Sequence, residues 1–373
     1  MRTRTGWLAF ALVLATAGEL LAQGTGTPLE NRRDEPITRT GTRGANFLEI
    51  GVGAQAQALG GSYTARAMGP TALYWNTAAT ALTETFAAGF SHTELFEGSG
   101  VTHQFAGALL PTNLGTIGVS VISLSSGKMT RTTEAYPLGG DPQYGGEFEW
   151  TATAIGLHYA RRITDRLSVG VAGKFVTEGI TGANASYVGA DLSTLFNTGL
   201  YGITLGAALV NIGSSGRMEG QLIEDRLSPG RTEDLFGNRR RQDVLLKTQE
   251  APLPTQFRFG IMMDLVGSAT ALLAPNPDHR FVVLTDISDA IDTAIQTSIG
   301  FEYSFRDILF LRAGKQWLNE ARAEHRDSFT FGLGGGAGLR IPLGGSRMIG
   351  IDYSYRDHGD LNNTQVISVE VAF

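Results

Sequence analysis

The sequence predicts an all-β transmembrane protein: an antiparallel outer-membrane β-barrel of about 14 strands with an N-terminal lumenal plug that contains a short helix. Three observations predict this fold. Apolar and polar residues alternate with a period of two through most of the chain after residue 85, as in a wall between lipid and water. There is no run of about 18 apolar residues that could span a bilayer as a helix. The links between the predicted strands alternate in length.

The composition narrows the class of protein further. The chain has 373 residues, with 49 glycines, 18% charged residues and a formal net charge of −6. This balance offers no basic surface, so no nucleic-acid partner is expected. The absence of cysteine fits an exported protein that does without disulfides. The remaining options are a large periplasmic β protein and a membrane barrel.

Residues 1–22 have the features of a secretory signal peptide. Arg2 and Arg4 form a positive start, the apolar run from Trp7 to Ala17 is too short to span a bilayer, and Ala22 suits cleavage. Residues 23–45 are polar, rich in Thr, Gly and Arg, and show no periodicity. We therefore expect them to form a flexible periplasmic arm.

Residues 46–85 form the predicted plug. The segment is rich in glycine and alanine, and Glu49 and Arg66 are its only charges before residue 83. An extended strip is expected first, followed by one short helix, because Pro70 fits a first helical turn, where its missing N–H is not needed. The plug or gate residues are predicted to be Leu59, Gly60, Gly61, Pro70, Leu73, Tyr74, Trp75 and Asn76.

The same segment resembles the N-terminal signature of the PorV/PorQ family of outer-membrane proteins, a FadL-like barrel group associated with type IX secretion. The chain departs from the signature at Gln55, where Arg is common, and at Thr77, where Pro is usual. The matching positions are Phe47, Leu48, Gly51, Gly53, Ala54, Gly60, Gly61, Ala72, Leu73, Tyr74, Trp75, Asn76 and Ala78.

The resemblance implies a function in type IX protein secretion, with exported cargo proteins and subunits of the secretion translocon as partners. The alternative is a FadL-like transporter of hydrophobic small molecules, with the N-terminal segment as its gate. A third reading is a structural barrel that the plug only seals. In each case the barrel contacts outer-membrane lipid.

Residues 86–373 are predicted to form the barrel. In the segment 296–305, Ile299, Phe301 and Tyr303 fall on one face, and Gly300 and Glu302 on the other. A soluble sandwich also alternates, but aromatic residues near the strand ends favour a membrane wall. The strands are expected to begin near Phe86, Val101, Gly115, Phe148, Arg166, Ser186, Leu200, Thr255, His279, Ile295, Asp307, Asp327, Arg347 and Thr364.

The links between these strands support the same topology. The tight links, such as 111–114 and 342–346, fall on the crossings that an inner turn would occupy, and the long links 126–147, 211–254 and 317–326 on the others. An even number of strands places both termini on the periplasmic side. The terminal Phe373 resembles the assembly signal of outer-membrane barrels.

Alternation predicts a set of charged side chains that face the lumen. Both signs occur, so pairing with the plug or across the lumen is expected rather than a selective pore. The residues are Lys174, Arg258, Asp264, Glu302, Arg312, Asp352, Arg356 and Glu370.

The remaining candidates for chemistry are weak, and no enzyme activity, cofactor or metal is expected. The six histidines lack metal-ligand spacing, and His158 is predicted to face the lumen. The glycines of 332–338 suit a wall thinned for close packing. Asp286, Asp289 and Asp292 are expected in a solvated outer loop. The long link 211–254 is either functional, as a lid or docking surface, or disordered.

Overall fold

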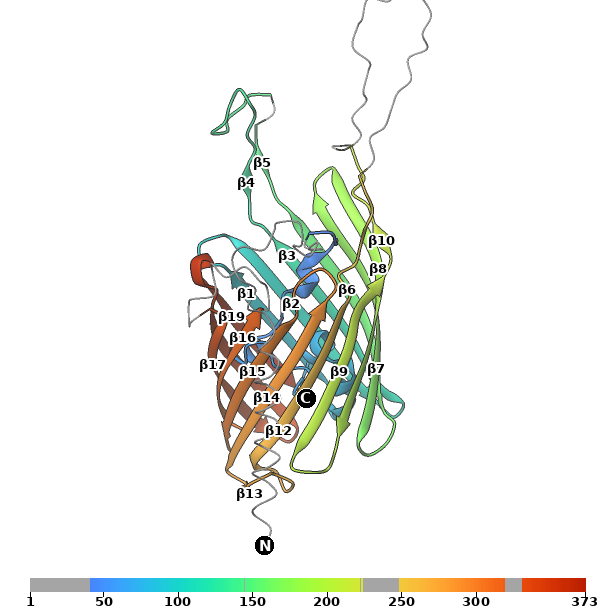
Figure 1. Cartoon of the computed structure of the whole chain (residues 1–373), viewed down its shortest axis with the longest axis vertical. Helices are drawn as coiled ribbons and strands as arrows, with labels where there is room; N and C mark the ends of the chain where they lie inside the picture. Colours follow the sequence, from blue (N-terminus) through green and yellow to red (C-terminus); the bar gives the residue numbers. More distant parts are fainter. Residues whose placement is uncertain (1–40, 144, 222, 224–247, 319–330) are drawn as a thin grey trace, which may run out of the picture.

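The computed structural model describes residues 41–143, 145–221, 223, 248–318 and 331–373. Fourteen strands of this part of the chain form a closed antiparallel barrel in which strands that follow one another along the chain pair side by side (Figure 1). The pairings of β1 with β19 and of β9 with β12 leave the ring without a free edge. The two-residue β13 (Ala274–Pro275) lies in parallel beside β12, outside the ring. The predicted fold class is confirmed.

The wall strands are β1 (Ala87–Leu95), β2 (Val101–Thr112), β3 (Gly115–Ser125), β6 (Thr151–Arg162), β7 (Leu167–Ile180), β8 (Ala183–Asn197), β9 (Ile203–Gly213), β12 (Gln256–Gly267), β14 (His279–Ala290), β15 (Gln296–Phe305), β16 (Leu309–Leu318), β17 (Leu333–Gly344), β18 (Arg347–Asp357) and β19 (Asn363–Ala372). All begin within about three residues of the expected positions except β17, whose expected first residues, 327–330, lie outside the described residues. The short links lie at the end of the barrel that carries Phe373, which is the periplasmic end of this outer-membrane protein.

The period of two sorts the side chains of the wall between lipid and lumen. On β18, Ile351, Tyr353 and Tyr355 are exposed, whereas Asp352 and Ser354 are buried. An alternating strand places its odd and even side chains on opposite faces, so each face meets one environment. The outward face is the apolar band that hydrocarbon requires.

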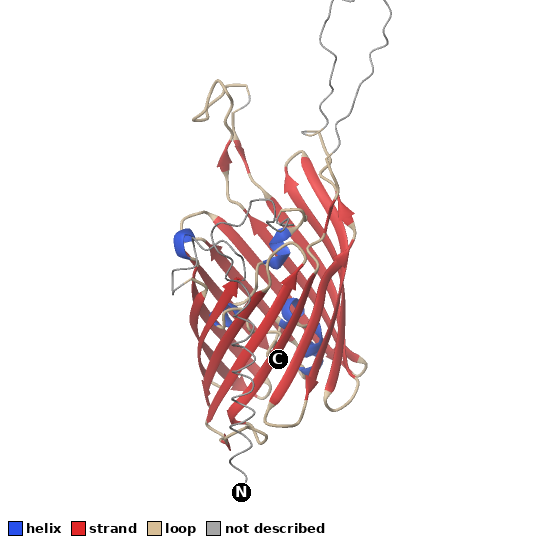
Figure 2. Cartoon of the chain, viewed as in Figure 1, coloured by secondary structure: helices blue, strands red, loops and turns tan. Residues whose placement is uncertain are grey.

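Four short helices lie inside the barrel, joined by turns (Figure 2). They are η1 (Asn46–Glu49), α2 (Ala54–Ala58), α3 (Ala72–Trp75) and η2 (Thr77–Leu82). The expectation of an extended strip followed by one helix is therefore wrong. Pro70 does not open a helix either, because Thr71 is the N-cap of α3 and Pro70 lies in the turn before it.

The plug starts at the outer end of the lumen. The Gly44 N–H donates to the Pro252 carbonyl at 3.1 Å, and the Ala45 N–H donates to Glu178 near the outer end of β7 at 2.8 Å. Gly44 and Ala45, which the sequence assigns to the periplasmic arm, are thus buried at the opposite end of the barrel. The predicted signal peptide and the arm as far as residue 40 lie outside the described residues.

Wall glycines allow the plug backbone to approach the sheet. A Cβ at Gly314 would lie 2.1 Å from the Leu59 carbonyl carbon, and one at Gly206 would lie 2.5 Å from the Thr64 carbonyl oxygen. The predicted thinned wall at 332–338 follows the same rule, because Gly334 faces the carbonyl of Gln57 in α2. Any larger residue at these positions would push the plug away from the wall.

Two hairpin extensions continue the outer ends of the wall. The two-residue strands β4 (Met129–Thr130) and β5 (Glu147–Phe148) pair in a hairpin that stands above the rim, and β10 (Ser215–Gly216) pairs with β11 (Ala251–Pro252) (Figure 1). Most of the long link between β10 and β11 lies outside the described residues, so the expectation of a lid there stays a prediction. No helix in the described ranges has the length and apolarity that a membrane span requires.

Candidate functional site: the plug and the outer cavity

A buried ion-pair chain joins the plug to one side of the wall. Arg66 of the plug pairs with Glu302 at 2.9 Å, and Arg312 pairs with both Glu302 and Asp352 at 2.7 Å. Arg340 pairs with the other oxygen of Asp352 at 2.9 Å. Each carboxylate therefore lies between two guanidinium groups, an arrangement that offsets the cost of burying the charges.

The same side of the wall holds the plug backbone through hydrogen bonds. Asp286 accepts from the N–H groups of Tyr63 and Thr64 at 3.1 and 2.8 Å, and Ser368 accepts from the Ala54 N–H at 2.9 Å. The expectation that Asp286 lies in a solvated loop is wrong, because β14 continues to Ala290 and places this carboxylate in the lumen. In the sequence, acidic residues near the end of a strand suggest a solvated loop. The plug N–H groups that bind Asp286 cannot be identified from the sequence.

The predicted gate aromatics connect three parts of the plug to Arg258 of β12. The Tyr74 hydroxyl donates to the Leu48 carbonyl, and the Trp75 indole donates to the Val52 carbonyl. The guanidinium of Arg258 lies 4.5 Å from the ring centroid of Tyr74 and 5.0 Å from that of Trp75. Cation–π contact and the hydrogen bonds from Arg258 to the Tyr74 carbonyl and hydroxyl fix this cluster.

Toward β2 and β3 the plug helix α3 meets the wall through an apolar side chain. Leu73 is fully buried, and its methyl groups lie against Gly107 and Gly118, beside Leu109. A continuous apolar cluster extends from these residues to the outer end of the lumen. Its members include Phe47, Leu48, Leu73, Phe105, Leu109, Ile122, Ala152, Ala154 and Val176.

At the periplasmic end of the plug, η2 packs against β6, β7 and β8. His158 faces the lumen and its Nδ1 lies 3.1 Å from the Thr77 hydroxyl, while its Nε2 lies 2.8 Å from that of Ser120. The hydroxyl of Thr77 makes this contact. The proline that is usual in the PorV/PorQ signature has no hydroxyl and could not make it. His158 and Ser120 lie on adjacent strands, and both are buried beneath η2.

The remaining gate residues and lumenal charges take the following places. Gly60 lies against the backbone of Lys315, and Asn76 donates to the carbonyls of Thr64 and Thr194. The other lumenal charges form local pairs or contacts, Lys174 with Asp191 at 2.9 Å, Asp264 with Arg280 at 3.1 Å, and Glu370 against Gly69. Gly61 lines the outer cavity, and Phe373 lies at the periplasmic rim beside Phe86.

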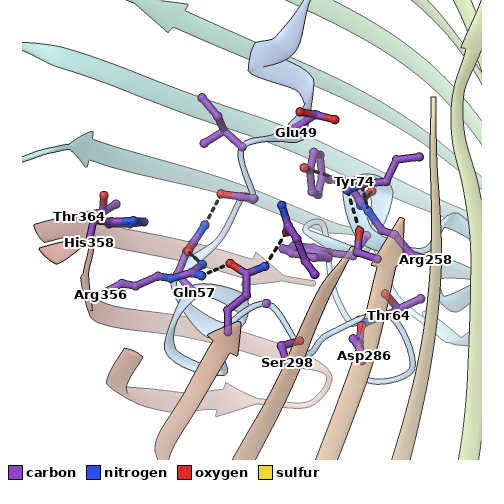
Figure 3. Close-up of a pocket in the computed structure, with 18 of the residues that line it drawn as sticks. Glu49, Gln57, Thr64, Tyr74, Arg258, Asp286, Ser298, Arg356, His358 and Thr364 are labelled. Carbon is purple, nitrogen blue, oxygen red and sulfur yellow. Dashed lines mark hydrogen bonds between the residues drawn. The ribbon is translucent and has the colours of Figure 1, made fainter. Parts of the chain in front are cut away.

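A cavity of ≈ 230 Å³ lies on the outer side of the plug (Figure 3). Its floor is the plug, with Gln57, Tyr74 and Trp75, and its walls are the outer ends of β12, β14, β15, β16, β18 and β19. Most of the residues that line it have polar side chains. The polar wall residues are Gln256, Arg258, Asp286, Ser288, Gln296, Ser298, Gln316, Arg356 and Thr364.

Glu49 of η1 lies at one edge of this cavity (Figure 3). Burial and then the nearby Asp292 raise the pKa of the Glu49 carboxyl to about 7, against a smaller opposing effect of Arg258. The folded protein therefore favours the protonated form of Glu49. This contribution to stability is present below the ordinary carboxyl pKa and is lost as the pH rises through about 7.

Sequence reasoning missed several residues of this site. Arg340 and Asp191 have the parity of lumen-facing positions on β17 and β8, so the alternation rule could have identified both. Arg66 was visible as a plug charge, but nothing in the sequence indicates its partner, Glu302, 236 residues away. Within the described ranges, no group of three or more His, Asp or Glu side chains is arranged to hold a metal ion.

Comparison with known proteins shows the fold. No family model and no curated protein match the sequence. The toluene transporter TodX of Pseudomonas putida has a TM-score of 0.54 at 12% identity, over 86% of this chain and 96% of that one. The monoaromatic hydrocarbon channel CymD has a TM-score of 0.52 at 11% identity, over 87% and 97%. The chain thus shares the barrel fold of these two proteins.

Proposed function

We propose that the protein conducts hydrophobic small molecules across the outer membrane and that the plug is its gate. One observation carries this proposal: the ion pair between the plug and the wall lies on one side of the lumen, whereas toward β2 and β3 the plug meets the wall through apolar side chains. A shift of the plug relative to the wall would part the seam between Leu73 and the wall residues Phe105 and Leu109, where no ion pair has to break. The fold shared with TodX and CymD, which are described as a toluene transporter and a hydrocarbon channel, supports the same reading.

The cysteine-free sequence permits a direct test of plug movement. The hydroxyl oxygens of Ser62 in the plug and Ser298 in β15 lie 2.8 Å apart, so the variant S62C/S298C is placed to form a disulfide that fixes the plug to the wall. In cells that lack their own transporter of hydrophobic compounds, we expect the oxidised variant to lose uptake of N-phenyl-1-naphthylamine, an uncharged fluorescent probe. Reduction with dithiothreitol should restore uptake.

A matched control links two wall strands instead. Ile351 and Val369 are exposed on the lipid side and lie opposite each other on β18 and β19, so I351C/V369C crosslinks the wall and touches no plug contact. This variant and the single variant S62C should both conduct the probe. If the S62C/S298C disulfide forms and uptake is unchanged, the plug is not a gate.

A second candidate function is a type IX secretion component of the PorV/PorQ kind, which binds exported cargo or the translocon. Its support is the family-like signature in the plug together with one feature of the outer surface. The β4–β5 hairpin exposes apolar side chains above the rim: Leu138 is 95% exposed, and Met129, Tyr136 and Phe148 are also exposed. Exposed apolar residues gathered on one projection are typical of a surface that binds a protein.

Co-purification from native membranes tests this second candidate. If it holds, secreted proteins or translocon subunits should co-purify with the wild type and be lost with the variant L138D. The control L114D changes a leucine that is 72% exposed on a periplasmic turn and should retain the partners. Absence of such proteins from the wild-type preparation would exclude this function.

A further inference from the structure

Arg356 is a buried cation without a carboxylate partner in the part of the chain that the structure describes. Its side chain lies in the lumen near the outer end of β18, and the residue is 8% exposed. Its Nη1 donates to the Gln57 carbonyl oxygen at 2.9 Å, and its Nη2 donates to that of Gln316. Among the residues that the structure describes, its Nε–H has no hydrogen-bond partner. A buried charge that is solvated only by neutral groups is strongly unfavourable.

The other lumenal arginines are treated differently. Arg66, Arg312 and Arg340 each pair with a buried carboxylate, and Arg258 lies over two aromatic rings. Carboxylates or aromatic rings of the protein therefore compensate each of these charges. Arg356 differs because no carboxylate or aromatic ring of the described residues compensates its charge.

The groups around Arg356 suit a hydrophilic ligand. Gln57 and Gln316 turn their carbonyl oxygens to Arg356 and donate their amide groups to the Gly51 carbonyl and to Gln296, at 2.6 and 2.7 Å (Figure 3). Thr364, on the neighbouring strand, has a buried hydroxyl with no partner in the described ranges. Arg356, Thr364 and these glutamines all line the cavity of ≈ 230 Å³ on the outer side of the plug.

We propose that this end of the outer cavity binds a small hydrophilic anion, a carboxylate or phosphate group on a compact hydrogen-bonding body. The free Nε–H of Arg356 and one Nη–H, released when a glutamine rotates, form the two-pronged donor that such oxyanions accept. The ligand enters from the outer face, because the plug separates the cavity from the periplasmic end. A long apolar chain does not suit the amides that surround the guanidinium.

Ligand binding by the purified, detergent-solubilised protein tests the inference without any transport step, so its failure and that of the proposed function are distinguishable. The probes are inorganic phosphate, acetate and decanoate, each titrated at constant ionic strength against sodium chloride. Calorimetry measures affinity, and the thermal midpoint reports stabilisation. We expect saturable binding of phosphate or acetate to the wild type, with a rise in the midpoint.

The variant R356Q should lose at least tenfold in affinity for the same anions. The control R347Q changes an exposed arginine at the periplasmic end of the same strand and should bind like the wild type. Folding is controlled by the ligand-free midpoint, which should not fall in R356Q because the change removes an uncompensated charge. Three results would overturn the inference: no saturation with phosphate or acetate, equal binding by R356Q, or tighter binding of decanoate than of acetate.

Discussion

The two sides of the lumen hold the plug by different physical means. Toward β14–β19 the contacts are ion pairs and hydrogen bonds, such as Arg66 to Glu302 and Tyr63 N–H to Asp286. Toward β2 and β3 the contacts are apolar, centred on Leu73. Hydrogen bonds and ion pairs require defined geometry, whereas apolar contact is non-directional. The charged side therefore sets the position of the plug, and the apolar side fills space and tolerates displacement.

The largest effect should follow from a change on the charged side. The variant R312Q leaves each of two carboxylates, Glu302 and Asp352, with one guanidinium partner instead of two. We expect a loss of about 3–5 kcal/mol in the free energy of unfolding, because breaking a buried pair leaves uncompensated charge. Urea unfolding of the purified barrel, followed by its heat-dependent mobility in gels, measures the change. R347Q is the control, and a loss below about 1 kcal/mol would show that the chain of ion pairs does not anchor the plug.

A smaller effect is expected on the apolar side. The variant L73A removes a fully buried side chain and leaves a cavity between the plug and the glycines of β2 and β3. We expect a loss of about 2–3 kcal/mol, the lower part of the range for such changes, because the ion pairs still hold the plug. Uptake of the hydrophobic probe should rise at the same time.

The matched control for this second change is L110A, on β2 at a position that is 54% exposed on the lipid side. It removes the same atoms from one of the strands that Leu73 contacts but leaves the seam intact. An equal rise in uptake with L110A, or no rise with L73A, would contradict the difference between the two sides.

The sequence predicted the wall well because one simple rule governs it. Each strand meets two environments, so Tyr353 and Asp352 are assigned to opposite faces by parity alone. The same rule placed the eight lumenal charges without knowledge of their partners. It failed at Asp286, where the carboxylate was assigned to a loop because acidic runs are usually solvated.

The plug was harder to predict because its conformation depends on the wall. The five-residue helix α2 has no side-chain hydrogen bond at its N-cap and is too short to be stable alone, so tertiary packing determines it. The glycines that admit the plug backbone, such as Gly206 and Gly314, lie on strands far apart in sequence. That they contact the same plug can be recognised only in the closed barrel.

The pairing of β1 with β19 has a consequence for biogenesis. The plug ends at η2, a few residues before β1, and β1 pairs with the last strand of the chain. The ring is complete only after the final strand docks, and by then η2 is tethered to the closing joint. The first segment must therefore be inside the forming cylinder when this joint closes, since no gap between strands remains for it afterwards.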